Sequence, residues 1–446
     1  MSGAVLRWAR TQVPAHPVGR AVAASALIGW IGTGVWISAS ALFFTRLLNL
    51  TADQVGGGLA MGGVLGLLAM VPISSLARRR HAGRVATVLQ IVRGLSFLAF
   101  FTVHSTATFY LALALVSVTD GPGKMFSQIV VGRFVPTSER SATMASIQVA
   151  TNIGVTAGAL LGTVGLLRVD RTAFDAVVGI VAAAFFLSAW LLAHTTWRTA
   201  DLDQAQPTGP KTDRPADPTA GRPAGGRIRS ALLPIRDRGF ALLTVGNGLL
   251  SLHIPLISVM TPLWLAHRTS VPPATMGALL LLNTLTVVAL QVPLGNRVKD
   301  LRSGVRAGWA AGMLLAGGCG LLALAAFVPT GWAVASLAGA VLCFTLGEIV
   351  QVTAGWTLSF AFAPEDHRQA LYLGFFGTGP EAVAVLGPAV LAWLTTRLGA
   401  GGFAVVAATL IGAAALVRAG TAALGGPHPA PVAVPAAEPE VCERTG

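Results

Sequence analysis

Residues 134–140 read Phe-Val-Pro-Thr-Ser-Glu-Arg and residues 362–368 read Phe-Ala-Pro-Glu-Asp-His-Arg, so that Phe, Pro and Arg recur at an offset of 228. Each segment directly follows a long apolar stretch. The same offset carries Asp120, in the middle of the first stretch, onto Glu348, in the middle of the second. A match that includes both a loop and an acid within an apolar stretch indicates an internal duplication.

Around these segments, the sequence divides into twelve apolar stretches that are long enough to cross a bilayer as helices, which takes about 20 residues each. They lie at 21–46, 55–76, 84–103, 107–131, 141–165, 174–196, 239–266, 274–296, 304–327, 331–361, 368–396 and 401–420. Of all residues, 54% are hydrophobic and only 11% are charged, against about 25% charged in soluble proteins. The sequence therefore predicts an all-α membrane protein with twelve transmembrane helices in two pseudo-symmetric six-helix bundles.

The predicted organisation has five parts. Residues 1–20 form an N-terminal segment, 21–196 the first bundle, 197–238 a linker, 239–420 the second bundle and 421–446 a tail. The linker and the tail are rich in proline and cannot bury enough surface to offset the entropy of ordering, so both are predicted to be disordered. The first apolar stretch exceeds the roughly 7–15 residues of a signal-peptide core, which indicates a retained span.

The net charge of +13 is explained by topology. If the N-terminus lies inside, 24 of the 31 Lys and Arg residues fall on the cytoplasmic side, five on the other side and two within spans. This bias follows the positive-inside rule. It predicts a multi-pass membrane protein with both termini in the cytoplasm and no nucleic-acid partner. Arg far outnumbers Lys, and Ala, Gly, Leu and Val dominate, which indicates a GC-rich bacterial genome and hence a bacterial inner membrane.

Several function classes are excluded by the sequence. It contains neither a Gly-x4-Gly-Lys-Ser/Thr segment for nucleotide-driven transport nor a nucleophile elbow. Cys319, Cys343 and Cys442 are not placed as a disulfide pair or a metal site. We therefore expect no enzyme activity, no cofactor and no metal, and we expect a monomer whose energy comes from a gradient or a partner.

Five charged side chains stand out deep inside the predicted spans, where each costs about 2.5–3.5 kcal/mol on insertion scales. They are Arg93, Asp120, Lys124, Glu348 and Glu381. Asp120 and Lys124 are four residues apart and share a helix face. Two interpretations stay open for them, a structural ion pair or a site for substrate or protons. Arg93 is expected to snorkel or to pair with Asp120.

Three acids, Glu348, Asp120 and Glu381, are the predicted proton-coupling residues. The stretch around Glu348 has no Lys or Arg, and a lone carboxyl in low dielectric can exchange a proton near neutral pH. The alternative is a carboxyl that stays protonated and hydrogen-bonds a neighbouring helix. Glu381 follows Gly-Thr-Gly-Pro at 377–380, where a helix can break and free its backbone carbonyls.

Other polar and aromatic residues are candidates for a substrate cavity. They are Lys124, Gln128, His253, Gln351 and Trp36. Gln128 continues the face of Asp120 and Lys124. His253 titrates in a useful range, although a lone histidine is more often a structural group. Trp36, like Trp30, Trp264 and Trp356, either lines an aromatic cavity or anchors a helix at the membrane interface.

These features together resemble a twelve-helix Major Facilitator Superfamily transporter, and within it the bacterial drug:proton antiporter branch. Gly347-Glu348, followed by Pro364, Arg368 and Tyr372-x-Gly374, carries the likeness to exporters of that branch. The family's loop motif Gly-x-Leu-small-Asp-Arg-x-Gly-Arg-Arg is matched in part by residues 76–84, with Arg78 in the place of Asp, and by residues 294–297, with Asn296 there. The resemblance implies two bundles around a central cavity that opens alternately to each side.

The resemblance also implies roles for two further groups of residues. A cytoplasmic gate would contain Arg78, Arg79, Arg84, Asn296 and Arg297. Gly154, Gly158 and Gly162 repeat every four residues and leave one helix face bare, so that another helix can approach closely. In the family, such a face serves the contact between the two rocking bundles.

The predicted function is proton-coupled efflux of a small amphipathic or lipophilic compound, such as a drug or a metabolite of the producing cell. Protonation of Glu348 would favour one facing state. The partners would be this small-molecule substrate, protons and the lipid bilayer. Two alternatives stay open: an importer or facilitator of a polar nutrient on the same fold, and a non-transporting membrane receptor or assembly subunit.

Overall fold

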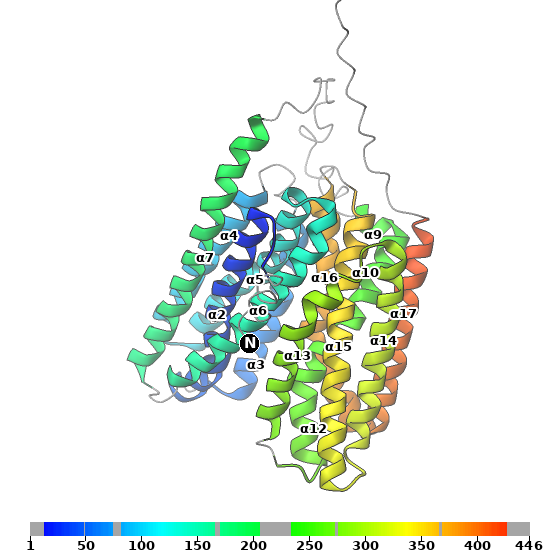
Figure 1. The fold of residues 1–446 in the computed structure, drawn as a ribbon. Helices are drawn as coiled ribbons and strands as arrows, with labels where there is room; N and C mark the ends of the chain where they lie inside the picture. Colours follow the sequence, from blue (N-terminus) through cyan, green and yellow to red (C-terminus); the bar gives the residue numbers. More distant parts are fainter. Residues whose placement is uncertain are drawn as a thin grey trace, which may run out of the picture.

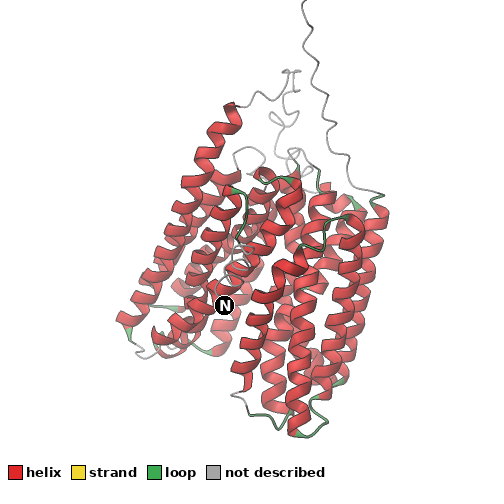
Figure 2. Ribbon diagram, in the orientation of Figure 1, coloured by secondary structure: helices red, strands yellow, loops and turns green. Residues whose placement is uncertain are grey.

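The computed structural model describes residues 13–48, 50–74, 82–165, 170–205, 233–272, 275–364 and 368–425. Over these residues the chain is helical, and Figure 2 shows helices joined by loops, without a strand in the described part of the chain. Figure 1 shows two groups of long helices side by side, one from each half of the sequence. The predicted all-α fold class is confirmed.

The N-terminal bundle contains six long helices. They are α2 (Pro17–Arg46), α3 (Ala52–Ser74), α4 (Ala82–Leu98) with the 3-10 turn η2 (Ala99–Thr102), α5 (Thr106–Phe134), α6 (Thr137–Gly165) and α7 (Arg171–Ala205). The C-terminal bundle begins with the short α9 (Leu233–Arg236). A first span follows, made of α10 (Arg238–Leu250), α11 (His253–Pro255), the π-helical η3 (Leu256–Met260) and α12 (Thr261–Arg268). The other five are α13 (Thr275–Gly295), α14 (Leu301–Leu324), α15 (Thr330–Phe362), α16 (Gln369–Leu398) and α17 (Gly401–Ala423).

Eleven of the described spans are long and apolar enough to cross a membrane. The twelfth, α5, has 29 residues, a length of about 44 Å at 1.5 Å per residue. Asp120, Pro122 and Lys124 near its centre lower its hydropathy. It nevertheless runs among the other helices of the N-terminal bundle (Figure 1), so the arrangement agrees with the predicted two groups of six.

Several helix boundaries differ from the prediction by a few residues, and three of them lie at the ends of the bundles. α2 begins at Pro17 instead of residue 21, because proline is well suited to the first turn of a helix. α7 continues to Ala205, although the linker was expected from 197. The helix can continue because residues 197–206 contain neither glycine nor proline. α17 ends at Ala423 instead of 420. The disorder predicted for the linker 197–238 is wrong for its described ends, where α7 continues to Ala205 and α9 spans Leu233–Arg236. The rest of the linker, 206–232, and the tail from 426 to 446 lie outside the described residues.

The internal duplication is visible in two equivalent helix ends. α5 ends at Phe134 and α15 ends at Phe362, the first residues of the two matching segments. The residue after each helix is extended, with ψ of 133° at Val135 and 130° at Ala363. In both copies a proline follows, and proline disfavours helical backbone in the residue before it. The repeated Phe-x-Pro therefore ends corresponding helices in the two bundles.

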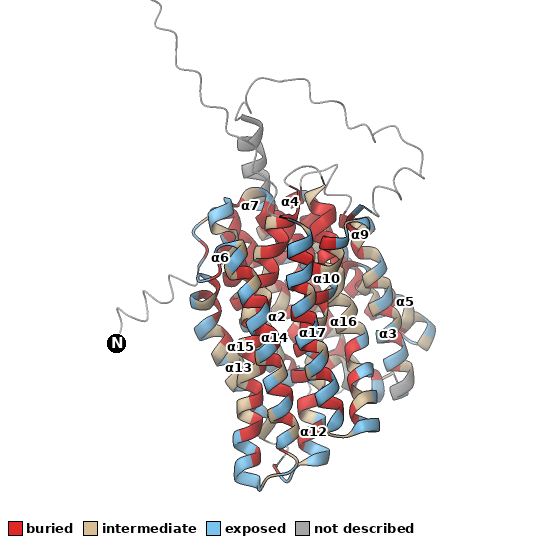
Figure 3. Ribbon diagram, turned by 90° about the vertical axis from the view of Figure 1, so that its right-hand side faces the viewer, coloured by how far each residue is buried: buried red, intermediate tan, exposed pale blue. Residues whose placement is uncertain are grey.

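The outer surface of the helices is apolar. Large hydrophobic side chains such as Leu68, Leu160, Phe327 and Trp332 are more than half exposed, and Figure 3 shows exposed residues along the outward faces of the helices, with buried ones between them. A soluble protein rarely exposes so continuous an apolar surface. This distribution is the one expected for helices that face lipid.

The glycine face of α6 packs as closely as predicted, but against a different helix. A Cβ on Gly154 would lie 2.6 Å from the Leu27 carbonyl oxygen, and one on Gly162 would lie 2.8 Å from the Val35 carbonyl oxygen. Gly158 faces Ile31 in the same way. Leu27, Ile31 and Val35 all belong to α2. The face therefore holds two helices of the N-terminal bundle together, which corrects the expectation that it lies at the interface between the bundles.

The two bundles meet at the linker side, the end of the molecule at which α7 ends and α9 begins. The Gln128 side-chain amide of α5 donates a 2.8 Å hydrogen bond to the Ser359 hydroxyl of α15. In a second contact, a Cβ on Gly295 of α13 would lie 3.1 Å from Ala145 Cβ of α6. Because consecutive spans alternate in direction, both contacts lie in the half of the molecule nearest the linker. The bundles are therefore closed against each other on that side.

Candidate functional site

The centre of α5 presents two opposite charges on one helix face. The segment 120–124 reads Asp-Gly-Pro-Gly-Lys, and the helix continues through Pro122, although proline cannot donate the usual backbone hydrogen bond. Asp120 and Lys124 are one turn apart, and the Lys124 ammonium lies 2.6 Å from Asp120 Oδ2. Local helix geometry therefore forms the first pair of the site.

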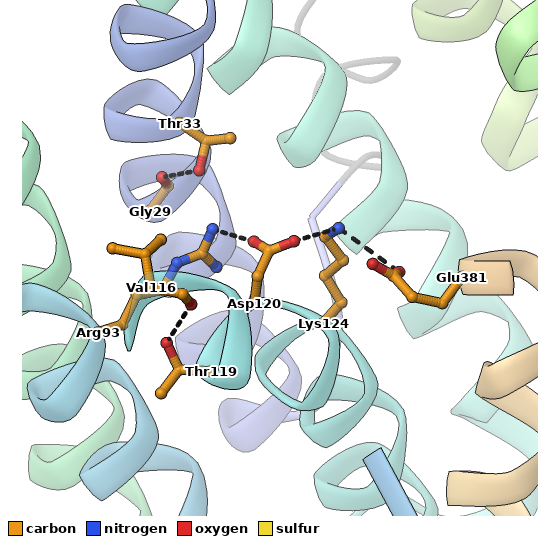
Figure 4. A network of polar contacts seen from close by, with 8 residues as sticks. All are labelled: Gly29, Thr33, Arg93, Val116, Thr119, Asp120, Lys124 and Glu381. Carbon is orange, nitrogen blue, oxygen red and sulfur yellow. Dashed lines mark hydrogen bonds and ion pairs between the residues drawn. The ribbon is translucent and has the colours of Figure 1, made fainter. Parts of the chain in front are cut away.

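Two further helices extend this pair into a chain of four charges, as Figure 4 shows. Arg93 Nη2 of α4 donates a hydrogen bond to Asp120 Oδ1. On the other side, the Lys124 ammonium lies 3.6 Å from Glu381 Oε2 of α16. The order is Arg93, Asp120, Lys124, Glu381, with signs that alternate along the chain. The last contact crosses from the N-terminal to the C-terminal bundle.

The position of Glu381 depends on close packing of α16. A Cβ on Gly379 would lie 3.1 Å from Gly248 Cα of α10, so the two backbones touch there. α16 is one continuous helix over Gln369–Leu398 with Pro380 inside. The expected helix break is therefore wrong: the helix continues through Pro380, although proline cannot donate a hydrogen bond and crowds the carbonyl four residues before it. Two residues after the contact with α10, Glu381 reaches Lys124.

A cavity of about 350 Å³ lies beside this chain of charges. Its wall comes mainly from α2, α4, α5, α6 and α7, and α15 and α16 contribute a few residues. The polar lining consists of Ser25, Thr33, Gln90, Arg93, Lys124, Ser127, Gln128, Gln148 and Thr151. Trp30 and Trp356 belong to the aromatic part of the wall. The cavity thus combines an apolar and aromatic surface with polar groups at one level of the bundle.

Two predicted cavity residues, Lys124 and Gln128, line this cavity. Trp36 does not, which corrects its expected place. Its ring packs against Phe44, Phe97 and Phe100 with centroid distances of 4.5–5.5 Å. Trp36 is therefore part of the aromatic core of the N-terminal bundle. Trp30 and Trp356, two of the tryptophans with the same two interpretations, do line the cavity.

His253 and Gln351 also lie elsewhere, so their predicted place in the cavity is corrected. His253 is buried, and its Nδ1 is 3.1 Å from the Leu250 carbonyl oxygen. It belongs to the interruption of a span that continues as the π-helical η3. The Gln351 side-chain amide donates a 2.7 Å hydrogen bond to Asn247 Oδ1 of α10. The Gln351 bond joins two helices of the C-terminal bundle, whereas the His253 bond is local to its own span. For His253 this agrees with the structural alternative that was left open.

Glu348 stands apart from the chain of charges. It is half-buried on α15 and accepts a hydrogen bond from the Asn283 side chain of α13. Asn283 also donates a 2.8 Å hydrogen bond to the Thr345 hydroxyl. No cation of the described residues forms an ion pair with Glu348, and it does not line the cavity. The two predicted acids Asp120 and Glu381 come together around Lys124, whereas Glu348 does not join them.

The predicted gate is described only in part. Arg78 and Arg79 lie outside the described residues. Arg84 is exposed near the start of α4, and Asn296 and Arg297 are exposed directly after α13. These three residues lie at the linker side, which is where a gate between the bundles would act.

Sequence reasoning missed Gln90 and Gln148, the two other amide side chains of the cavity wall. A usable signal existed for Gln90, because it lies one turn before Arg93 and the two therefore share a helix face. As for metals, no group of three or more His, Cys, Asp or Glu side chains within the described ranges could hold an ion. The site is therefore built from ion pairs, amides and aromatic rings.

Comparison with known proteins places this architecture among membrane transporters. A family model described as Major Facilitator Superfamily matches residues 21–379. No curated protein sequence matches the chain. A bacterial homologue of the iron transporter ferroportin, solved in an outward-facing state, is 14% identical, with 92% of this chain and 100% of that chain covered and a TM-score of 0.68.

Two other solved structures have the same fold. The human organic anion transporter MFSD10 is 17% identical, with 91% of this chain and 98% of that chain covered and a TM-score of 0.63. The E. coli fucose:proton symporter FucP is 11% identical, with 90% and 98% covered and a TM-score of 0.64. At these identities the likeness concerns the fold and leaves the substrate open.

Proposed function

This chain belongs to the Major Facilitator Superfamily, and we propose that it is a proton-coupled secondary transporter that moves a small amphipathic compound by alternating access. The Lys124–Glu381 ion pair carries the proposal. It joins the two bundles beside the cavity, so its charge state bears directly on whether the bundles stay together. The positive-inside bias supports placing the linker side in the cytoplasm, and the described conformation is then the one closed to the cytoplasm.

The strength of this pair sets the scale of the coupling. Two unit charges 3.6 Å apart attract by about 5 kcal/mol at an effective dielectric constant of 20, before desolvation is subtracted. The Lys124 side chain is 36% exposed, so screening reduces this figure. Even a net 1–2 kcal/mol shifts a two-state equilibrium by a factor of about 5 to 30. A proton on Glu381 removes this attraction and favours separation of the bundles.

Glu381 is proposed as the acid that exchanges its proton because it is paired more loosely than Asp120, with one cation at 3.6 Å where Asp120 has two cations, one of them at 2.6 Å. Lys124 is the charged group that faces it from α5, with Asp120 and Arg93 behind. His253 of α11, another element packed against α16, is engaged with the Leu250 carbonyl. Asp120 has two cations and stays charged, which favours its structural interpretation. Its role is to hold Lys124 within reach of Glu381.

Glu348 is proposed as a second proton-binding group that acts away from the substrate. Its hydrogen bond with Asn283 links α15 to α13, and α13 forms part of the contact between the bundles. A change in the charge of Glu348 would therefore act on helix packing and not on a bound molecule. Transport by Glu348→Gln that followed an imposed pH gradient with unchanged stoichiometry would exclude this role.

The direction of transport depends on the charge of the substrate. A cationic substrate competes with the proton for a carboxylate, which gives antiport and the predicted efflux. An anionic substrate replaces Glu381 beside Lys124 and moves together with a proton, which gives uptake. The charged side chains among the cavity-lining residues are Arg93 and Lys124, and this favours uptake of an anion. Efflux of a lipophilic compound is the second candidate, supported by the aromatic wall with Trp30 and Trp356.

Transport in membrane vesicles tests both coupling and direction. Right-side-out vesicles with an acidic exterior are expected to accumulate carboxyfluorescein, an anion. Everted vesicles with an acidic interior would accumulate ethidium, a cation, if efflux is the function. In either case, Glu381→Gln is expected to abolish the dependence on the pH gradient.

The matched control is Asp175→Asn, which breaks a partly exposed ion pair of 3.0 Å with Arg171 in α7 and leaves the cavity intact. This variant should respond to the gradient as the wild type does. If Glu381→Gln retained the full gradient dependence, proton coupling through this residue would be excluded.

A further inference from the structure

Two polar atoms in the cavity wall are buried without a protein partner. They are Arg93 Nε, a hydrogen-bond donor, and Gln90 Oε1, an acceptor. Buried polar atoms in folded proteins nearly always have a partner, so this pair requires an explanation. Both residues lie on α4, one helical turn apart, and both side chains face the same space.

The other ends of these side chains are fixed. The Gln90 side-chain amide donates a 2.8 Å hydrogen bond to the Ser188 hydroxyl of α7. Arg93 donates to Asp120, and its guanidinium lies 4.3 Å from the centroid of the Phe185 ring. Arg93 as a whole is only 7% exposed. The two unpartnered atoms are therefore held in place instead of rotating to find other partners.

Gly123 of α5 lines the cavity next to these two side chains. A Cβ at this position would lie 3.8 Å from Arg93 Nη1 and 4.0 Å from Gln90 Oε1. The next residue, Lys124, adds a cation whose ammonium lies 5.9 Å from the centroid of the Trp30 ring. A donor, an acceptor, a cation and an aromatic wall thus converge on one part of the cavity.

Arg93 and Lys124 are close enough for one carboxylate to contact both of them. Asp120 already does this, with Oδ1 on Arg93 and Oδ2 on Lys124. Of the two acids beside Lys124, Glu381 is the more distant, at 3.6 Å against 2.6 Å for Asp120. Glu381 is therefore the partner that a second carboxylate can replace. The aromatic wall suits a ring attached to that carboxylate.

We propose that the cavity binds a small aromatic carboxylate with a hydrogen-bond donor next to the carboxylate group. The carboxylate pairs with Lys124 on the cavity side, where it competes with Glu381 for the ammonium group, and it accepts a hydrogen bond from Arg93 Nε. The neighbouring donor, such as a hydroxyl, donates to Gln90 Oε1. The ring lies against Trp30. This assignment rests on the proposed transport function and specifies its substrate class.

Charge balance adds a consequence for protons. The four charged groups sum to zero, so one bound anion leaves an uncompensated negative charge in a partly buried site, which is costly. A proton on the displaced Glu381 restores neutrality. Binding of one carboxylate is therefore expected to take up about one proton from solution.

Equilibrium dialysis of the purified full chain in detergent tests the site with three related probes. Mandelate carries a carboxylate and a neighbouring hydroxyl, phenylacetate lacks the hydroxyl, and phenethylammonium carries the opposite charge. We expect mandelate to bind most tightly, phenylacetate more weakly and phenethylammonium at least about tenfold more weakly than mandelate, since hydrogen bonds to charged groups decide the difference. Equal or tighter binding of the cation, or no binding of any probe at millimolar concentration, would overturn the proposal.

Three variants test the assigned contacts. Lys124→Gln should weaken mandelate binding by about tenfold to a hundredfold, whereas the exposed Lys299→Gln should leave it unchanged. Gln90→Leu should remove the preference for mandelate over phenylacetate. Glu381→Gln should bind mandelate about tenfold more tightly, because Lys124 loses its competitor. Structural damage does not produce a gain in affinity, so unchanged or weaker binding by Glu381→Gln overturns the assignment.

Proton uptake separates this inference from the proposed function. A pH-sensitive dye in weak buffer should report about one proton per mandelate bound by the wild type and none by Glu381→Gln. Carboxylate-selective binding without proton uptake would support the ligand site and contradict proton coupling through Glu381. Proton-coupled transport by a protein that binds phenethylammonium more tightly than mandelate would support the proposed function and contradict the ligand site.

Discussion

Replacing Gly158 by alanine is expected to destabilise the protein through one added methyl group. A Cβ at this position would press on the Ile31 carbonyl oxygen of α2, and it would lie 2.8 Å from the Ile31 carbonyl carbon and 3.0 Å from Gly34 Cα. All three contacts are with backbone atoms, so no side-chain rotation can relieve them. α2 and α6 must move apart to accept the methyl group.

The magnitude follows from two opposing contributions. Overpacking a close contact typically costs about 1–3 kcal/mol, and replacing glycine by alanine inside a helix returns up to about 1 kcal/mol. Gly179→Ala in α7 is a matched control, because no heavy atom lies within 4 Å of a Cβ there. Gly179→Ala therefore keeps the gain in helix propensity and has no overpacking cost. The difference between the two variants is therefore about 1–3 kcal/mol, with the helix propensity cancelled.

Thermal unfolding in one detergent, at one heating rate, measures this difference. The Gly158→Ala midpoint should lie below that of Gly179→Ala, and the control should equal or exceed the wild type. A fixed heating rate matters because membrane proteins often unfold irreversibly, and the apparent midpoint then depends on the rate. Equal midpoints for the two variants would refute the argument that the glycine face is under steric constraint.

Three further outcomes are expected. Hydrogen bonds from Ser303 hold the pKa of Asp300 below its ordinary value. This carboxylate therefore stabilises the folded state above its unfolded pKa of about 3.9, and its contribution is lost as pH falls through the lower folded pKa. Thermal midpoints between pH 7 and pH 3 should fall more in the wild type than in Asp300→Ala. Trp36→Ala should cost about 3 kcal/mol of unfolding free energy and leave the dissociation constant for mandelate unchanged in dialysis. Ser359→Ala should cost about 1 kcal/mol, because the Gln128 amide loses its acceptor across the bundles, and the thermal midpoint again provides the measurement.

The overall fold could be predicted from the sequence because the features that determine it lie within single segments of the chain. A span is recognised from the length of an apolar stretch, and the duplication from the Phe-x-Pro segments at 134–140 and 362–368. The pairing of Asp120 with Lys124 follows from the helical repeat alone. Even the one span that hydropathy underrates, α5, could be recognised, since its polar centre has an equivalent at Glu348.

The contents of the cavity were much less predictable. Trp36 and Trp30 are both tryptophans of α2, yet one packs in an aromatic core and the other faces the cavity. The glycines of α6 predicted that another helix packs closely against this face, but they did not identify that helix as α2. Helices that are apolar on every side carry little information about which side faces which partner.

The sequence by itself determined that this protein spans a membrane in two duplicated halves. It also determined that a few charged side chains lie within the spans, where their energetic cost makes them functional candidates. Only the tertiary structure decided that Glu381 meets Lys124 across the bundles while Glu348 pairs with an amide. The physical reason is that charge and length are properties of one segment. A contact between segments depends on how each helix is rotated about its own axis, and that is set by packing against all its neighbours at once.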